Sequence, residues 1–70
     1  GLHVEDVNRA MQRLPEQQRE ILLLVAGAGL SYEEAAEVAG CNIGTVKSRL
    51  NRGRAAIKAL IEGADTDAAA

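Results

Sequence analysis

The apolar residues between Asn42 and Leu60 recur with the period of an α-helix. Four of them would share one face, and they are Ile43, Val46, Leu50 and Ile57. Asn42 stands immediately before this stripe and is a favourable N-cap, because its side-chain oxygen can accept a hydrogen bond from a free backbone N–H of the first turn. The pattern therefore predicts a helix over residues 42–60 that buries one face.

Apolar patterns upstream predict further helices. The first covers His3–Arg13 and ends where Pro15 interrupts it. Proline is favourable at the first position of a helix, so we expect the second helix to run from Pro15 to about Ala26, where two glycines stop it. No stretch shows the alternation of β-branched residues that is typical of strands. The expected fold is therefore all-α.

A short third helix and a tight turn are predicted to lead into the basic helix. Ser31 and Glu34 form the S-x-x-E pattern of a capping box, which predicts a helix over Tyr32–Ala39. Gly40 would end it, because glycine tolerates the left-handed conformation common at helix C-termini. Cys41 would fill the gap after the turn. We therefore expect a four-helix domain with a C-terminal helix-turn-helix and no wing.

The charges of the chain are segregated, although its net charge is only −2. Residues 1–37 carry three basic and seven acidic side chains, residues 38–61 carry five basic and no acidic ones, and residues 62–70 carry three acidic ones. The five basic residues are Lys47, Arg49, Arg52, Arg54 and Lys58. A domain with one basic edge can dock on nucleic acid through that edge despite an acidic total.

The composition argues against several other functions. Cys41 is the only cysteine, which leaves no internal disulfide and no thiolate metal site. No nucleophile–base pair or metal-ligand cluster accompanies the glutamates, so we expect neither an enzyme nor a bound cofactor. No signal peptide or membrane-length apolar run occurs, so we expect a cytoplasmic protein without a membrane partner. Residues 63–70 are small and acidic, and we expect them to form a disordered tail to a domain over residues 1–62.

Several motifs together carry a family resemblance. They are LPEQQRE at residues 14–20, LSYEEAA at residues 30–36, GTVKSRL at residues 44–50 and the continuation Arg52-x-Arg54. With these motifs, the chain up to about residue 61 resembles region 4 of bacterial extracytoplasmic-function (ECF) sigma factors, and especially the general-stress sigma factors of alphaproteobacteria. The promoter-melting region of a sigma factor does not occur here. We therefore expect a domain excised from a longer protein, unable to direct transcription by itself.

The resemblance implies partners and contact residues. Such a domain binds the −35 element of promoter DNA, contacts the flap of the RNA polymerase core and is commonly sequestered by an anti-sigma factor; in isolation we expect a monomer. The positions that match base-contacting ones in the major groove are Lys47, Ser48, Asn51 and Arg52. Further residues are expected to contact the DNA backbone, because they match such positions of the family or because of their place on the helix over residues 42–60. They are Arg19, Ser31, Tyr32, Thr45, Arg49, Arg54 and Lys58.

Two residues depart from the family pattern. Gly53 stands where the family often has alanine, which lowers helix propensity by roughly 1 kcal/mol. Asn51 stands where larger side chains are common, and this leaves its base preference open.

Three other interpretations remain open on the sequence alone. The basic helix could be a solvated face without a partner. The chain could be a sigma-like interaction module that binds an anti-sigma factor rather than DNA. Such a module has no need of the basic and polar residues of the fourth helix, which here are Lys47, Ser48, Arg49, Arg52 and Arg54. It could also be the effector domain of a two-component regulator, although Arg52-x-Arg54 and the long fourth helix are more typical of sigma factors.

Overall fold

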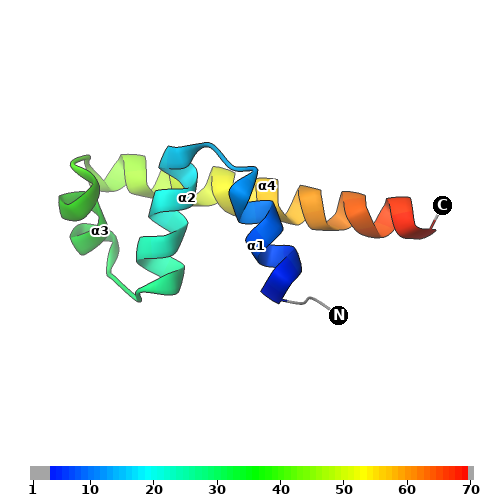
Figure 1. Cartoon of the computed structure of the whole chain (residues 1–70). Coiled ribbons are helices and arrows are strands. Elements are labelled where there is room, and N and C mark those ends of the chain that lie inside the picture. Colours follow the sequence, from blue (N-terminus) through cyan, green and yellow to red (C-terminus); the bar gives the residue numbers. More distant parts are fainter. Residues whose placement is uncertain (1–3, 70) are drawn as a thin grey trace.

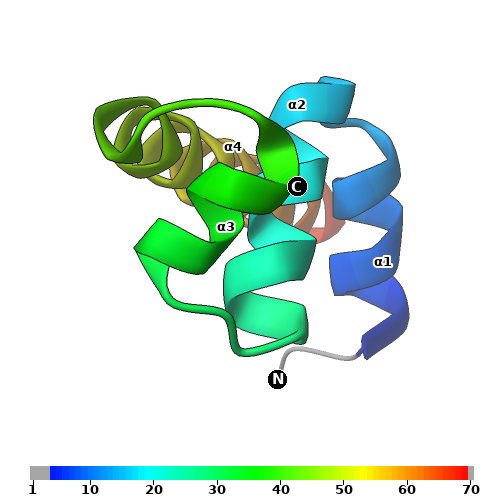
Figure 2. The same ribbon diagram turned by 90° about the vertical axis from the view of Figure 1, so that its left-hand side faces the viewer.

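The computed structural model describes the backbone of residues 4–69 and the side chains of residues 5–63. Three short helices pack on one side of a long one (Figures 1 and 2). In chain order the elements are α1 (Val4–Gln12), α2 (Glu16–Leu22), the π-helical turn η1 (Leu23–Gly27), α3 (Tyr32–Ala39) and α4 (Ile43–Ala69). The described residues contain no strand, and the expectation of an all-α fold with a C-terminal helix-turn-helix is confirmed.

The first two helices are joined by a short turn at Pro15. Helix α1 lies within the predicted range, while the expected start at His3 falls outside the described residues. Helix α2 begins one residue later than predicted, because Pro15 is extended, with ψ 145°, and acts as the N-cap. The Pro15 carbonyl oxygen accepts the backbone N–H groups of Gln18 and Arg19, each at 3.0 Å. Proline therefore starts this helix from just outside it.

The second helix does not continue as a regular α-helix to Ala26, as the sequence predicted. It widens at Leu23 into the π-helical turn η1, in which the backbone N–H of Ala28 donates to the Leu23 carbonyl at 2.8 Å. Gly29 then takes a positive φ of 74°, and the N–H of Leu30 returns to the Leu24 carbonyl at 3.0 Å. Backbone hydrogen bonds thus close the end of this helix.

Helix α3 has the bounds and both ends that the sequence predicted. The Ser31 hydroxyl accepts the Glu34 backbone N–H at 3.1 Å, and a Glu34 carboxylate oxygen accepts the Ser31 N–H at 2.9 Å, so the capping box is complete. At the other end Gly40 is left-handed, with φ 71°. The N–H groups of Gly40 and Cys41 donate to the carbonyls of Glu37 and Ala36, the paired bonds of a Schellman motif. These local bonds fix the tight turn of the helix-turn-helix.

Helix α4 is a continuous helix of 27 residues that spans the molecule (Figure 1). It begins where expected, since the Asn42 side-chain oxygen accepts the Thr45 backbone N–H at 2.8 Å. It does not end near Leu60. The backbone of residues 63–69, for which a disordered tail was expected, continues the helix. Alanine has the highest helix propensity of all residues, and this segment is rich in it. The division into a domain over residues 1–62 and a separate tail stays a prediction.

The core lies where the three short helices meet α4 and consists of small aliphatic side chains. Its buried hydrophobic residues are Ala10, Leu14, Ile21, Leu22, Ala35, Ala36, Val46 and Leu50. On α3 the buried residues Ala35 and Ala36 carry only a methyl group each, which allows α3 to approach α4 closely. Tyr32 and Cys41 pack against the same cluster from its edge. In Figure 2, α3 lies in front, α1 at the right, and α4 recedes behind them.

The apolar stripe of α4 differs from the expectation at its first residue. Val46 and Leu50 are 0% and 1% exposed, but Ile43 is 38% exposed. Helical spacing decides on which face a residue lies, whereas burial also requires a neighbouring helix at the same turn. The first turn of α4 follows directly on the tight turn and is only partly covered.

Candidate nucleic-acid interface

The side of α4 that faces away from the core is uncovered. Ser48 projects on the side opposite the buried Val46 and Leu50, because these residues differ from it by two positions in either direction along the helix. All four residues expected to contact bases are exposed, namely Lys47, Ser48, Asn51 and Arg52. Arg54 and Lys58 are exposed as well, whereas Thr45 and Arg49 are half-buried. The helix-turn-helix thus presents the predicted polar residues on one free surface.

The exposed residues of α4 fall into a central group and a flank. Lys47, Arg54 and Lys58 are spaced by seven and four residues, so their side chains align along one flank of the helix. Ser48 and Asn51 lie nearer the middle of the free face. With a rise of about 1.5 Å per residue, Lys58 stands about 15 Å along the axis from Ser48. Since a major groove is about 12 Å wide, one groove does not accommodate both residues near its floor.

The N-terminal turn of α4 is electrostatically different from those of the three other α-helices. Acidic residues occupy the first turns of α1, α2 and α3, and they are Glu5, Asp6, Glu16, Glu33 and Glu34. The first turn of α4 carries none. A helix N-terminus is a partial positive charge that attracts anions unless a carboxylate already occupies it. The start of α4 is therefore the helix end best suited to a phosphate.

The N-terminus of α3 is already engaged by its own capping box. The two hydrogen bonds from Ser31, the backbone one first, lower the pKa of the exposed Glu34 carboxyl below its usual value. The Ser31 N–H is consequently not available to a DNA phosphate. Tyr32 is half-buried against the core. The N-terminus of α3 is therefore less open to an external anion than the start of α4, whose first turn carries no acidic residue.

Arg19 lies on α2, whereas the other basic residues proposed to contact DNA lie on α4. It is half-buried and lines a shallow hollow of about 310 Å³ together with Glu16, Glu20, Leu23 and Leu24. Leu23, at the start of η1, is 55% exposed. The hollow thus combines apolar side chains with both signs of charge, and it was not identified from the sequence.

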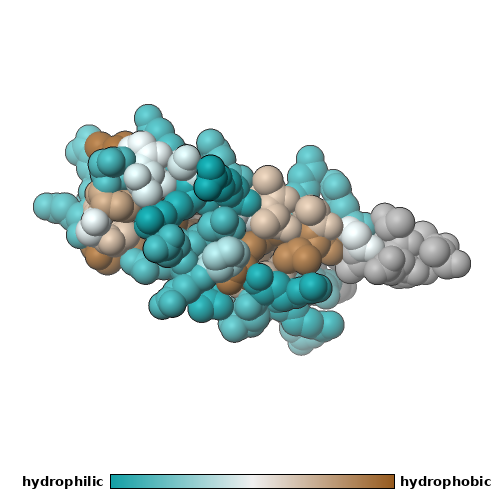
Figure 3. Space-filling view, turned by 90° about the horizontal axis from the view of Figure 1, so that it is seen from above, coloured by the Kyte–Doolittle hydropathy of each residue, from teal (hydrophilic) through white to brown (hydrophobic). Residues whose placement is uncertain are grey.

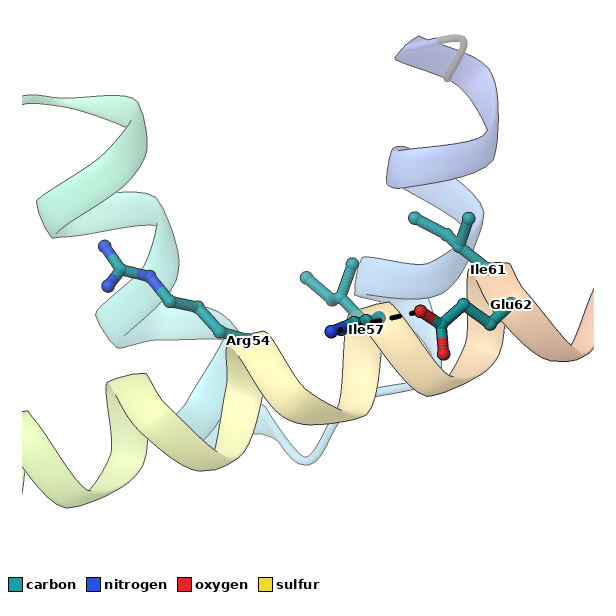
Figure 4. Close-up of a pocket in the computed structure, with 5 residues that line it drawn as sticks. Arg54, Ile57, Ile61 and Glu62 are labelled. Atoms are coloured by element: carbon teal, nitrogen blue, oxygen red, sulfur yellow. Dashed lines mark ion pairs between the residues drawn. The ribbon is translucent and has the colours of Figure 1, made fainter. Parts of the chain in front are cut away.

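A second hollow, of about 370 Å³, lies on the C-terminal half of α4 and was not identified from the sequence. Its lining residues are Arg54, Ile57, Lys58, Ile61 and Glu62. Figure 4 shows Ile57 and Ile61 projecting from the same side of α4, the side on which α1 lies. Lys58 and Glu62 form an exposed ion pair at 4.0 Å beside them. Seen from above, apolar surface is also exposed where α4 leaves the three short helices (Figure 3).

The described residues hold no other chemistry that suggests a ligand. Across residues 5–63, whose side chains are described, no group of three or more His, Cys, Asp or Glu could hold a metal ion. Within the same range, every helix is too short or too polar to cross a bilayer. The exposed basic face of α4 is the strongest candidate site.

Comparison with known proteins identifies the domain. Residues 5–57, most of the chain, match the family described as sigma-70, region 4. The chain belongs to the sigma-70 region 4 family. This confirms the resemblance drawn from the motifs, and it also agrees with the expectation that the chain is not an enzyme.

The relatives of this region 4 domain are RNA polymerase sigma factors, several of them named as ECF sigma factors. It is 47% identical over 66 residues to the ECF RNA polymerase sigma factor EcfG of Rhodopseudomonas palustris, which covers 91% of this chain and 36% of the relative. It is 51% identical over 55 residues to the RNA polymerase sigma-H factor of Pseudomonas aeruginosa, covering 77% and 28%. The chain thus spans about a third of the length of the curated relatives it matches.

A solved structure has the same architecture. It is the sigma factor RpoE of Bartonella quintana, crystallised in complex with the anti-sigma factor NepR. The TM-score is 0.81 at 40% identity, and the match covers 89% of this region 4 domain and 39% of the sigma factor. These comparisons support the family and fold; the individual DNA contacts assigned from the sequence stay predictions.

Proposed function

We propose that this domain reads the −35 element of promoter DNA as region 4 of an ECF sigma factor and so directs RNA polymerase to its promoters. One observation carries the proposal: α4 has an uncovered face with basic and polar residues, and its first turn is free of carboxylates. In a helix-turn-helix the N-terminal residues of the second helix enter the major groove. Lys47, Ser48, Asn51 and Arg52 occupy those positions here.

Base reading is proposed for residues 47–52 of the free face, and phosphate binding for the residues around them. The central residues have the donors and acceptors that distinguish base pairs, and Arg52 suits the O6 and N7 acceptors of guanine. The phosphate contacts fall to residues around them, which are Arg19, Ser31, Tyr32, Thr45, Arg49, Arg54 and Lys58. Phosphate contacts fix the register of the helix on the duplex without carrying sequence information.

The longer protein is proposed to act with two protein partners in the cytoplasm. RNA polymerase contacts this domain through its flap, and an anti-sigma factor sequesters it. The second partner is supported by the likeness to a sigma factor solved with NepR, and the likeness to EcfG favours the general-stress branch. Exposed Leu23 on η1 and the hollow at Ile57 and Ile61 supply apolar surface for a partner helix.

A competition experiment tests the anti-sigma proposal. Purified anti-sigma factor, added to a complex of the domain with DNA, is expected to release the DNA because it hides the same surface. Leu23→Gln should weaken the anti-sigma complex while leaving DNA binding intact, since Leu23 lies on η1 and not on α4. A stable ternary complex of DNA, domain and anti-sigma factor contradicts the proposal.

Selection of duplexes from a randomised pool tests the DNA-binding proposal. The domain is expected to enrich duplexes that share one short motif. Fluorescence anisotropy should then show tighter binding to a duplex with this motif (the enriched duplex) than to a scrambled one. Arg52→Ala should remove this preference, whereas Arg13→Ala, an exposed arginine outside the helix-turn-helix, should retain it. Absence of enrichment, with equal affinity for all duplexes, would point to the sigma-like interaction module instead.

A further inference from the structure

Gly53 is buried in α4 at the point where α2 crosses it. A Cβ atom built on Gly53 would lie 2.8 Å from Leu22 Cδ1, 3.3 Å from Leu22 Cγ and 3.7 Å from Gln18 Cβ. Real Cβ atoms essentially never come within 3.0 Å of another heavy atom. The Leu22 side chain therefore rests directly on the bare backbone of α4, in a space that any other residue would fill.

Leu22 has little freedom to move away from an added methyl group. It is one of the buried residues of the core cluster, together with Ile21 and Leu50. Its Cγ atom, which is not the mobile end of the side chain, would also be in close contact. Because protein interiors are packed as densely as organic crystals, a displaced Leu22 pushes on its neighbours, and α2 shifts outward with it.

The contact joins the two helices that are proposed to meet the same DNA duplex. Gly53 directly follows Arg52, a proposed base contact on α4, and directly precedes Arg54. Leu22 stands three residues after Arg19, the proposed backbone contact on α2, so one helical turn separates the two. The depth of the Leu22–Gly53 contact therefore sets where Arg19 stands relative to Arg52.

We propose that Gly53 is a positioning residue, whose missing side chain sets the spacing between α2 and α4 so that Arg19 reaches a phosphate while Arg52 is in the groove. The inference rests on the proposed DNA-binding function. It also gives a reason for glycine at this position: the lost helix propensity is offset by closer packing of α2 on α4.

The test substitution is Gly53→Ala, with Gly63→Ala as its matched control. Both replace a glycine of α4 by the same residue, but a Cβ atom at Gly63 meets nothing within 4 Å. Residual dipolar couplings, measured without DNA, should show a changed orientation of α2 relative to α4 in Gly53→Ala and not in Gly63→Ala. Leu22→Met, which replaces the branched end by a flexible one, should restore the orientation in the Gly53→Ala background.

DNA binding supplies the second measurement, on the duplex enriched by the wild-type domain. Gly53→Ala should weaken binding about tenfold, the scale of one hydrogen bond to a charged group. The slope of the logarithm of the binding constant against the logarithm of the salt concentration (the salt slope) should fall by roughly one unit, because one phosphate contact is lost. In an Arg19→Ala background, Gly53→Ala should then have little further effect.

Several outcomes would overturn the inference. An unchanged orientation of α2 in Gly53→Ala contradicts it whether or not the domain binds DNA. Weaker binding with an unchanged salt slope, and the same loss in the Arg19→Ala background, assigns Gly53 to stability alone. If the wild-type domain binds no duplex, the proposed function fails along with Arg19 positioning, even when the α2 shift is observed.

Discussion

The side-chain oxygen of Asn42 accepts a hydrogen bond of 2.8 Å from the backbone N–H of Thr45, and this bond fixes the residue at which α4 begins. Asn42→Ala is expected to destabilise the domain by about 1 kcal/mol, because it leaves a backbone donor of the first turn without its partner. Urea unfolding followed by circular dichroism measures the change. Asn51→Ala, the same replacement at an exposed position within α4, should have no such effect. Equal losses in the two variants contradict the capping role.

The capping box of α3 should make stability depend on pH in the acidic range. Because hydrogen bonds from Ser31 lower the pKa of Glu34 in the folded state, folding favours its ionised form. The contribution is therefore present above the unfolded value of 4.5 and is lost as the pH falls through the lower folded pKa. Glu34→Gln should flatten the acid branch of the stability curve, measured by thermal unfolding across this range.

Glu33→Gln is the control for the capping-box experiment. Glu33 is also acidic and lies in the first turn of α3, but it forms neither bond of the capping box. Its replacement changes the charge of the turn by the same amount. An acid branch that flattens equally in both variants would assign the effect to helix-end charge and not to the Ser31 hydrogen bonds.

Two residues of the predicted apolar stripe should differ sharply in their effect on stability. Leu50 is almost fully buried, and Leu50→Ala should cost about 2–5 kcal/mol through lost burial and the cavity left behind. Ile43 is 38% exposed, and Ile43→Ala should cost clearly less. Urea unfolding provides the comparison, with both variants fitted to one common dependence of the unfolding free energy on urea concentration. A larger loss at Ile43 would mean that the first turn of α4 is buried in solution.

Arg52 and Lys58 should respond differently to DNA sequence and salt. Arg52→Ala is expected to cost about 1–3 kcal/mol on the enriched duplex and to relax preference at one base pair. Lys58→Ala should weaken all sequences similarly and lower the salt slope by roughly one unit, as for a lost phosphate contact. Anisotropy on enriched and scrambled duplexes at several salt concentrations separates the two. If Arg52→Ala weakens both duplexes equally, Arg52 is a phosphate contact.

The domain alone is expected not to start transcription. It covers 36% of the length of EcfG from Rhodopseudomonas palustris, and its only aromatic side chain of the Phe, Trp and Tyr class is Tyr32. Capture of unpaired bases relies mainly on aromatic stacking, for which one tyrosine is a poor platform. A run-off assay with core polymerase and a promoter that contains the enriched motif should give no specific transcript. A transcript of defined length would refute this.

The helix ends that the sequence predicted are those that depend on a few adjacent residues. The Ser31–Glu34 capping box, the left-handed Gly40 and the Asn42 cap each use partners within five positions along the chain. Such bonds form whatever the rest of the molecule does, so residue identity is sufficient to predict them. The exposed polar face of α4 was predictable for a similar reason, since helical spacing alone defines it.

The features that sequence reasoning missed depend on contacts between helices. From the sequence alone Gly53 only lowers the helix propensity of α4, whereas in the fold Leu22, from another helix, packs against it. The partial exposure of Ile43 reflects where the other helices stop covering α4. The π-helical turn at Leu23 depends on how the chain leaves α2 to reach α3, and no single residue signals it. The contact roles of individual residues with DNA stay predictions, because they depend on a partner molecule.

Tyr32 packs on the edge of the core at the first turn of α3, and the chain has no tryptophan. The intrinsic fluorescence of the domain therefore comes from one ring at one known place. Unfolding, undocking of α3 and approach of a ligand to the helix-turn-helix each change the surroundings of that ring. Tyr32 is therefore an intrinsic fluorescence probe, and any change in tyrosine emission reports a change at the first turn of α3.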